Sequence, residues 1–158
     1  MSSSFDKLVQ SPLKFRLFLL MKLTSAYFSG VRVREFSSSK AVVSVPFKWF
    51  SQNPFRSTYF ACLAMAAEMS TGILALSNIY GAKKSVSMLV TKLEAEYYKK
   101  ADTVTFFTCE DGDAIRNCIQ QAIDTGEATQ IRAKAIGKNE EGERIAEFNI
   151  TWSFRLRK

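Results

Sequence analysis

The amino-acid sequence predicts one compact α+β domain in which a long apolar helix lies against an antiparallel sheet. Between Thr58 and Leu76 the only charged residue is Glu68, so a helix over this segment offers no polar face to water and must be buried all round. Several other segments alternate apolar and polar residues, as strands do when one face of their sheet is buried. A sheet with one solvent-exposed face must bury its other, apolar face, and we expect the apolar helix to pack against it.

Length and composition favour an ordinary globular domain. The chain has 158 residues, 47% apolar and 23% charged, which is enough to bury a core without metals or disulfides. We expect residues 1–29 to form an N-terminal helical extension and residues 30–158 to form the single sheet-containing domain. The formal charge of +7 indicates anionic partners without specifying which.

The absence of histidine excludes a large part of catalytic chemistry. Ser-His-Asp and Cys-His triads and His-ligated metals are ruled out, so a general base must be a carboxylate, a lysine, a thiolate or a tyrosine. Cys62, Cys109 and Cys118 are odd in number and widely spaced, so we interpret them as buried free thiols, not as a metal or redox site. Free thiols favour a reducing compartment, and we therefore expect a cytoplasmic protein.

The N-terminal extension is predicted to contain one helix. Ser11 and Pro12 are typical of an N-cap and a first helical residue, and the helix is expected to reach about Tyr27. A targeting presequence is the alternative, because Asp6 is the only acid before Glu35. This amphipathic stretch could touch a membrane, although packing in a core or a dimer is the commoner use.

The following segments are predicted to be two strands, an aromatic loop and the apolar helix. Residues 31–36 and 41–47 are rich in β-branched and aromatic residues and are separated by serines. The aromatic loop is expected at 49–55, and Ser57 after it is a plausible N-cap for the helix. A transmembrane helix is the alternative for residues 58–76, but Glu68 at the bilayer centre would cost about 3 kcal/mol.

The second half of the chain alternates between strands and one helix. Period-two alternation predicts that Leu89, Leu93, Ala95 and Tyr97 share the buried face of one strand. Another strand is expected at 104–109, and a helix follows the acidic start at 111–113 and stops at Gly126. The turn 137–142 joins the last two strands into a hairpin, and the final strand is expected to bury these residues: Ala146, Phe148, Ile150, Trp152, Phe154 and Leu156.

Residues 53–68, with the sequence NPFRSTYFACLAMAAE, resemble the helix-entry motif of hotdog-fold acyl-CoA thioesterases, particularly the phenylacetyl-CoA thioesterase-like group. In that family an Asn and a short spacer precede His-Gly-Gly, and an Asp or Glu follows seven residues after the last Gly. Asn53 and Glu68 fall on the family's Asn and catalytic carboxylate. The resemblance extends from Val31 to the end and implies a hotdog fold, in which a curved antiparallel sheet wraps the helix.

The His-Gly-Gly positions are occupied here by Tyr59, Phe60 and Ala61. The resemblance implies an oxyanion and substrate-binding role for these three residues and Asn53, because the family's turn brings a backbone N–H to the thioester carbonyl. An N–H at Ala61 can still serve from the N-terminus of a helix.

Glu68 has two interpretations. It is either a buried carboxylate satisfied by a neighbouring polar group, or a catalytic acid whose pKa is raised by apolar surroundings. Seven residues separate it from Ala61, about 10 Å along a helix. If both act on one carbonyl, they must come from different subunits, so we expect a homodimer or a tetramer of dimers.

Four lysines are tentative ligands for the phosphates of coenzyme A: Lys83, Lys84, Lys99 and Lys100. No cofactor, metal, nucleic-acid partner or stable membrane insertion is expected, and coenzyme A enters only as part of the substrate. Two functions stay open. One is an acyl-CoA thioesterase in which Glu68 activates water; the other is a non-catalytic acyl-binding, lipid-binding or structural module that kept the fold.

Overall fold

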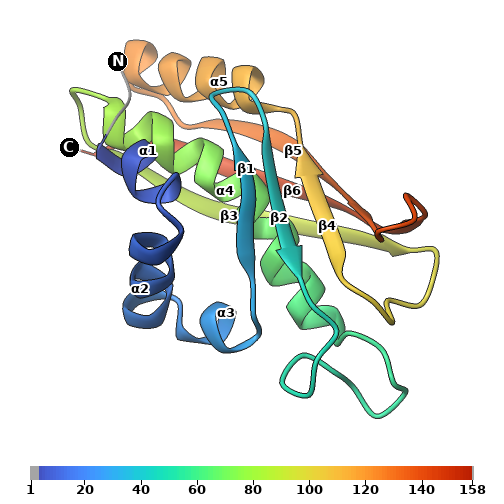
Figure 1. Cartoon of the computed structure of the whole chain (residues 1–158). Helices are drawn as coiled ribbons and strands as arrows, with labels where there is room; N and C mark the ends of the chain where they lie inside the picture. Colours follow the sequence, from blue (N-terminus) through green and yellow to red (C-terminus); the bar gives the residue numbers. More distant parts are fainter. Residues whose placement is uncertain (1–3, 158) are drawn as a thin grey trace.

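The computed structural model describes residues 4–157 and contains a six-stranded antiparallel sheet flanked by helices (Figure 1). The strands are β1 Arg32–Phe36, β2 Ala41–Val45, β3 Val86–Tyr97, β4 Thr105–Cys109, β5 Thr129–Lys138 and β6 Arg144–Leu156. The helices are α1 Ser4–Val9, α2 Pro12–Lys22, α3 Thr24–Phe28, α4 Phe60–Gly81 and α5 Gly112–Thr125. The strand order is β1-β2-β4-β5-β6-β3, so β1 and β3 form the two edges.

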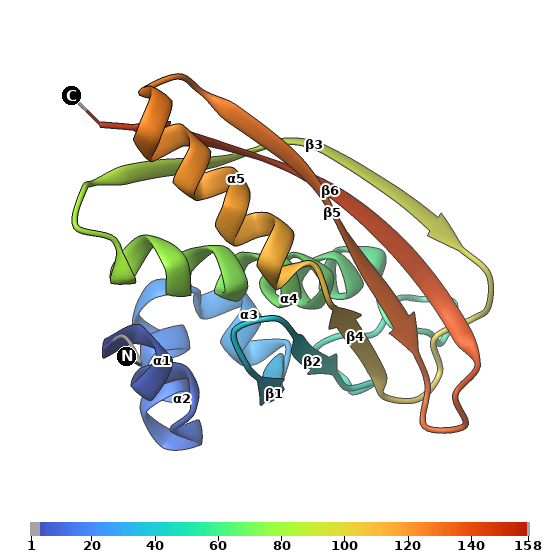
Figure 2. The same ribbon diagram turned by 90° about the horizontal axis from the view of Figure 1, so that it is seen from above.

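The helix α4 lies against the concave face of the sheet, as Figures 1 and 2 show. It packs on β2, β4, β5 and β6, while α5 packs beside it on β5 and β6. The edge strand β3 extends past this covered region. The predicted hotdog arrangement is therefore confirmed, with one long apolar helix wrapped by a curved antiparallel sheet.

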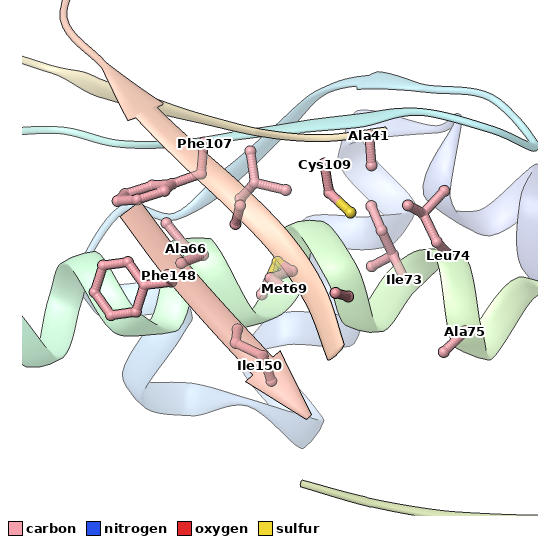
Figure 3. Close-up of a cluster of buried hydrophobic side chains, with 14 of the residues drawn as sticks. Ala41, Ala66, Met69, Ile73, Leu74, Ala75, Phe107, Cys109, Phe148 and Ile150 are labelled. Carbon is pink, nitrogen blue, oxygen red and sulfur yellow. The ribbon is translucent and has the colours of Figure 1, made fainter. Parts of the chain in front are cut away.

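The apolar composition of α4 is explained by its position in the core. Figure 3 shows Ala66, Met69 and Ile73 of α4 among the buried side chains, with Phe107 and Phe148 of the sheet toward Ala66 and Cys109 toward Ile73. In the part of the chain that the structure describes, α4 is the one helix with the length and composition of a membrane span. Most of it is buried beneath the sheet, as expected for the core helix of a globular protein.

The predicted single N-terminal helix is wrong in its extent. The backbone leaves the helical region at Leu23, with φ −139° and ψ 61°, so that α2 and α3 are separate helices. The turn between them allows Leu19 of α2 and Ala26 of α3 both to be buried. The helix α1 also precedes them and packs on α4, where Phe5 stacks on Tyr80 with ring centroids 5.0 Å apart.

The predicted buried face of β3 is wrong at Leu89. The register between β3 and β6 shifts between Val90 and Lys92, so the alternation on one side of this β-bulge is reversed relative to the other. Leu93 lies opposite the buried Ile150, whereas Leu89 lies opposite Ser153 and its side chain is 66% exposed. The bulge therefore places Val86, Met88 and Val90 on the inner face in place of Leu89.

Candidate active site

Glu68 lies in the middle of α4, on the side of the helix where Trp152 of β6 packs. A Cβ atom at Gly72, one turn later, would lie 3.2 Å from the Glu68 Oε1 atom and 3.4 Å from the indole ring of Trp152. The missing side chain at Gly72 thus leaves room for the carboxylate beside the indole. Glu68 itself is half-buried.

The Glu68 carboxylate has no hydrogen bond and no ion pair to any residue from 4 to 157. Burial disfavours its charged form and raises the pKa of Glu68 from 4.5 to about 7. Both the protonated and the ionised form of this carboxyl are then accessible near neutral pH. Such a group can accept a proton and return it within one reaction cycle.

The hydroxyl of Thr71, three residues after Glu68 on the same helix, already has hydrogen-bond partners. Thr71 Oγ1 donates to the backbone carbonyl of Glu68 over 2.9 Å and accepts the indole N–H of Trp152 over 2.8 Å. Thr71, Gly72 and Trp152 shape the space around the acid and were not predicted as site residues. Helical spacing of i+3 and i+4 from Glu68 could have indicated Thr71 and Gly72, whereas Trp152 comes from the remote strand β6.

The N-terminus of α4 carries two adjacent free amides. The helix begins at Phe60 and not at Thr58 as predicted, because the Thr58 N–H donates to Ala101 in another segment over 2.7 Å. Tyr59 is the N-cap residue in place of Ser57, and no side chain caps the helix. The N–H groups of Phe60 and Ala61 donate to no atom of residues 4–157, and the helix dipole adds partial positive charge there.

Asn53 holds the loop before α4 in shape. Its Oδ1 atom accepts the N–H groups of Phe55 and Ser57 over 3.0 and 3.2 Å, and its Nδ2 atom donates to Ser57 Oγ over 3.0 Å. These bonds close a tight turn in which Arg56 adopts a left-handed conformation with φ 58°. The side chain of Asn53 is thus used within its own loop, at the border of a surface groove.

That groove brings together four of the predicted site residues. It has a volume of about 390 Å³ and lies between the start of α4 and the end of β3, where Asn53, Phe60, Lys99 and Lys100 line it. Lys99 is paired with Glu143 over 2.6 Å, whereas Lys100 has no ion pair within residues 4–157. The Phe60 side chain is 57% exposed and its ring lies 4.8 Å from that of Tyr59.

Lys83 and Lys84 lie elsewhere. They line a different hollow of about 450 Å³ that follows the C-terminal end of α4. A helix of 22 residues is about 33 Å long, so the two lysine pairs lie near opposite ends of α4. Within one protomer the four lysines do not form one binding site.

The residues around Glu68 on α4 form a half-exposed stripe. Ala61, Ala64, Met65 and Glu68 follow the i, i+3, i+4, i+7 spacing of one helix face, and all four are half-buried. On the inner face of β3, Leu93 and Tyr97 are 46% and 50% exposed, and Tyr97 lines a groove with Phe60 at the start of α4. The stripe and the inner face of β3 are thus apolar surfaces that this protomer does not cover.

Cysteines and metal ligands offer no alternative centre. Cys62 and Cys109 are buried, and burial raises the pKa of the Cys109 thiol to about 12, so it is protonated at neutral pH. Within residues 4–157, no three His, Cys, Asp or Glu side chains lie close enough to hold a metal ion.

Comparison with known proteins places the chain in a family. Residues 15–154 match a domain of unknown function, DUF4442. The chain belongs to the DUF4442 family. No curated protein sequence matches it.

Solved structures share the fold of this DUF4442 domain. A protein of Pseudomonas aeruginosa described as a probable thioesterase has a TM-score of 0.77 and 19% identity, with 93% of this chain and 97% of that chain covered. A protein of unknown function from Chlorobaculum tepidum has a TM-score of 0.80 and 16% identity, with 99% of both chains covered. A thioesterase from Haemophilus influenzae has a TM-score of 0.65 and 11% identity, with 92% and 91% covered.

These likenesses confirm the fold-level resemblance to hotdog thioesterases that residues 53–68 indicated. Their identities of 11–19% establish a shared fold and no shared substrate or catalytic residue. The function of this DUF4442 domain must therefore be argued from its own residues.

Proposed function

We propose that this protein is a thioester hydrolase acting on acyl-CoA or a similar acyl thioester. The observation that carries the proposal is the Glu68 carboxylate, half-buried without a partner in residues 4–157 and with a pKa raised to about 7. A group with a pKa near the working pH is suited to general acid–base catalysis.

In the proposed reaction the Glu68 carboxylate takes a proton from water as the water oxygen attacks the thioester carbonyl carbon. The carbonyl oxygen gains negative charge and accepts hydrogen bonds from the free N–H groups of Phe60 and Ala61. The C–S bond then breaks, and the Glu68 carboxyl returns its proton to the leaving thiolate. The products are a carboxylic acid and a thiol, with Glu68 regenerated.

A shared site between two protomers supplies both groups to one carbonyl. Ala61 and Glu68 are about 10 Å apart along α4, and two antiparallel helices related by a two-fold axis would bring Ala61 of one protomer near Glu68 of the other. That register puts the axis close to Ala64 and Met65, in the middle of the half-exposed stripe. The uncovered inner face of β3 and its free strand edge would extend the same contact. A strict monomer in sedimentation at assay concentration would contradict this arrangement.

The groove beside Phe60 is the proposed position of the carrier. Lys100 has no ion pair in the described chain, so it is the better candidate of the groove lysines for a coenzyme A phosphate. Lys83 and Lys84 lie too far along α4 to contact the same groove of their own protomer.

The experiment is a panel of short-chain, long-chain and aromatic acyl-CoA substrates tested with wild type and Glu68→Gln. We expect the substitution to lower kcat/KM by about 10²–10⁴, the usual contribution of a general base. The wild-type kcat/KM should rise with pH through about 7, because the base must be deprotonated. Glu127→Gln, which changes an exposed acid in the loop after α5, is the matched control. Equal activities of wild type and Glu68→Gln would show that the catalytic assignment is wrong.

A second function is favoured by one observation. Phe60, and not a glycine, stands next to the free amides, and its ring packs against Tyr59 at the mouth of the groove. A module that binds acyl chains without turnover could tolerate this crowding. Acyl-CoA binding in calorimetry with no hydrolysis by wild type would support the binding module, and Phe60→Gly would then test whether access to the amides restores turnover.

A further inference from the structure

The net charge of the protein is confined to its first 67 residues. This part contains nine lysines and arginines but only two acids, Asp6 and Glu35, so it carries the whole formal charge of +7. Residues 68–158 contain thirteen bases and thirteen acids and are neutral. Such an asymmetry indicates a surface that meets an anionic partner.

Most positive charges of the first part have no ion pair within the described residues. Among residues 4–67, the only ion pair joins Lys40 to Glu35 over 3.0 Å. In the neutral part, six basic side chains are paired with acids: Lys92, Lys99, Arg116, Arg132, Lys134 and Arg144. The unpaired charges are therefore available to an external anion.

Exposed apolar side chains accompany these charges. The helices α2 and α3 and the loop 46–56 lie along one margin of the molecule, at the bottom of Figure 1; we call residues 12–28 and 46–56 the basic margin. Phe28 of α3 contacts Phe50 of the loop with ring centroids 5.6 Å apart, so the two segments are continuous. The most exposed apolar residues of this margin are Leu13 (84%), Trp49 (80%), Phe55 (79%), Met21 (64%), Leu17 (54%) and Phe50 (54%).

We propose that the basic margin docks on the surface of an anionic lipid bilayer. Leu13, Leu17 and Met21 follow helical spacing on one side of α2, and with Trp49 they would enter the boundary between headgroups and acyl chains. The exposed Lys14, Lys22 and Lys48 would lie at the level of the lipid phosphates. A nucleic acid would match the charge but would leave the apolar side chains in water, so the bilayer fits both observations.

Two hollows in the same part of the molecule suit anionic headgroups. Arg32, Arg34 and Lys48 line a hollow of about 340 Å³ in which Glu140 is the one acid. Between α2 and β1, Arg16 lies in a mostly apolar groove of about 400 Å³, with its guanidinium carbon 4.0 Å from the centre of the Tyr27 ring. The Arg16 Nη1 atom is buried and has no hydrogen-bond partner within residues 4–157. An anionic acceptor would satisfy this donor.

Vesicle flotation tests the proposal directly. Wild type should bind vesicles of phosphatidylcholine mixed with phosphatidylglycerol at least tenfold more tightly than pure phosphatidylcholine vesicles, and salt should weaken the binding. Tryptophan fluorescence gives a second measurement, because Trp49 is 80% exposed whereas Trp152 is 4% exposed. The emission should shift to the blue on binding, and Trp49→Phe should abolish this shift.

Matched charge reversals identify the surface. Lys14→Glu with Lys22→Glu should weaken binding to the anionic vesicles at least tenfold. Lys83→Glu with Lys84→Glu makes the same charge change at exposed residues near the far end of α4 and should leave binding within about twofold. Equal effects of the two pairs, or equal binding to neutral and anionic vesicles, would overturn the proposal. A lack of vesicle binding by wild type would also overturn the proposal. If Leu17→Glu then changed the oligomeric state, this face would be an interface between copies of the chain.

Discussion

Two polar side chains in the loop before α4 are hydrogen-bonded, whereas the carboxylate in the middle turn of α4 has no hydrogen bond in the described part of the chain. In the loop, Asn53 is bonded to Phe55 and Ser57, and Ser51 donates to the carbonyl of Pro46 over 2.6 Å. In the middle turn, the carboxylate of Glu68 has no partner within residues 4–157 although it is half-buried. Polar groups in the loop stabilise the fold, whereas the acid in the helix costs stability.

The difference in hydrogen bonding indicates a structural role for Asn53 and a chemical role for Glu68. A buried group that a protein needs only for folding is normally hydrogen-bonded, as Asn53 is. A buried acid that lacks such bonds has a raised pKa, which a fold tolerates where reactivity is needed. We therefore expect changes at Glu68 to alter activity and the pH dependence of stability, and changes at Asn53 to alter stability alone.

The largest expected effect on stability is the pH dependence that Glu68 imposes. Below pH 4.5 the acid is protonated in both folded and unfolded chains. Between pH 4.5 and about 7 the unfolded chain loses this proton while the folded chain keeps it, so the free energy of unfolding falls by about 3 kcal/mol and then stays level. Glu68→Gln should remove this fall, which denaturant unfolding at a series of pH values would measure.

The surface acids do not obscure this measurement. Pairing with lysines lowers the pKa values of Glu94, Glu143 and Glu147, so the stability that they provide is lost only as pH falls below their ordinary range. They are also present in both proteins, so the difference between wild type and Glu68→Gln isolates Glu68. A difference that is constant from pH 4 to 8 would mean that the folded pKa of Glu68 is normal.

Asn53→Ala should have the next largest effect. The substitution leaves the N–H groups of Phe55 and Ser57 without their acceptor, which should lower the free energy of unfolding by about 2 kcal/mol. Because the side chain acts within its loop, kcat for the proposed hydrolysis should change less than threefold. Gln52→Ala, an exposed neighbour, is the control for both measurements. A large loss of kcat with unchanged stability would instead make Asn53 a ligand of the substrate.

The main features of the fold could be predicted from the sequence because they depend on local patterns. The stretch without charge around Glu68 marked the core helix, and alternation marked the strands. The bulge in β3 could not be predicted, because it depends on the remote partner strand β6. In the bulge, the Thr91 hydroxyl bonds the Thr151 carbonyl of β6 over 3.3 Å, a contact that no pattern within β3 encodes.

The candidate site was predictable only in part. Glu68 stood out as the single acid of an apolar helix, but its lack of a partner depends on how β6 crosses α4. Lys99 and Lys100 looked equivalent in sequence, yet the β5–β6 turn brings Glu143 to Lys99 alone. All four lysines were predicted as tentative coenzyme A ligands because a sequence does not show the roughly 33 Å that α4 puts between the two pairs.

The smallest expected effect on the free energy of unfolding comes from Gly72→Ala. This substitution also gives the most specific test of the position of the Glu68 carboxylate. Its new methyl would lie 3.2 Å from Glu68 Oε1 and 3.4 Å from the Trp152 ring, so the carboxylate must move by a few tenths of an ångström. Alanine favours the helix by up to about 1 kcal/mol over glycine, which should offset the crowding and leave the free energy of unfolding nearly unchanged. Activity should nevertheless fall about tenfold, because catalysis depends on the position of the base.

Gly126→Ala, in the left-handed C-cap of α5 with φ 73°, should show the reverse, with lower stability and unchanged activity. Unchanged activity in Gly72→Ala would mean that the position of the Glu68 carboxylate does not limit the reaction.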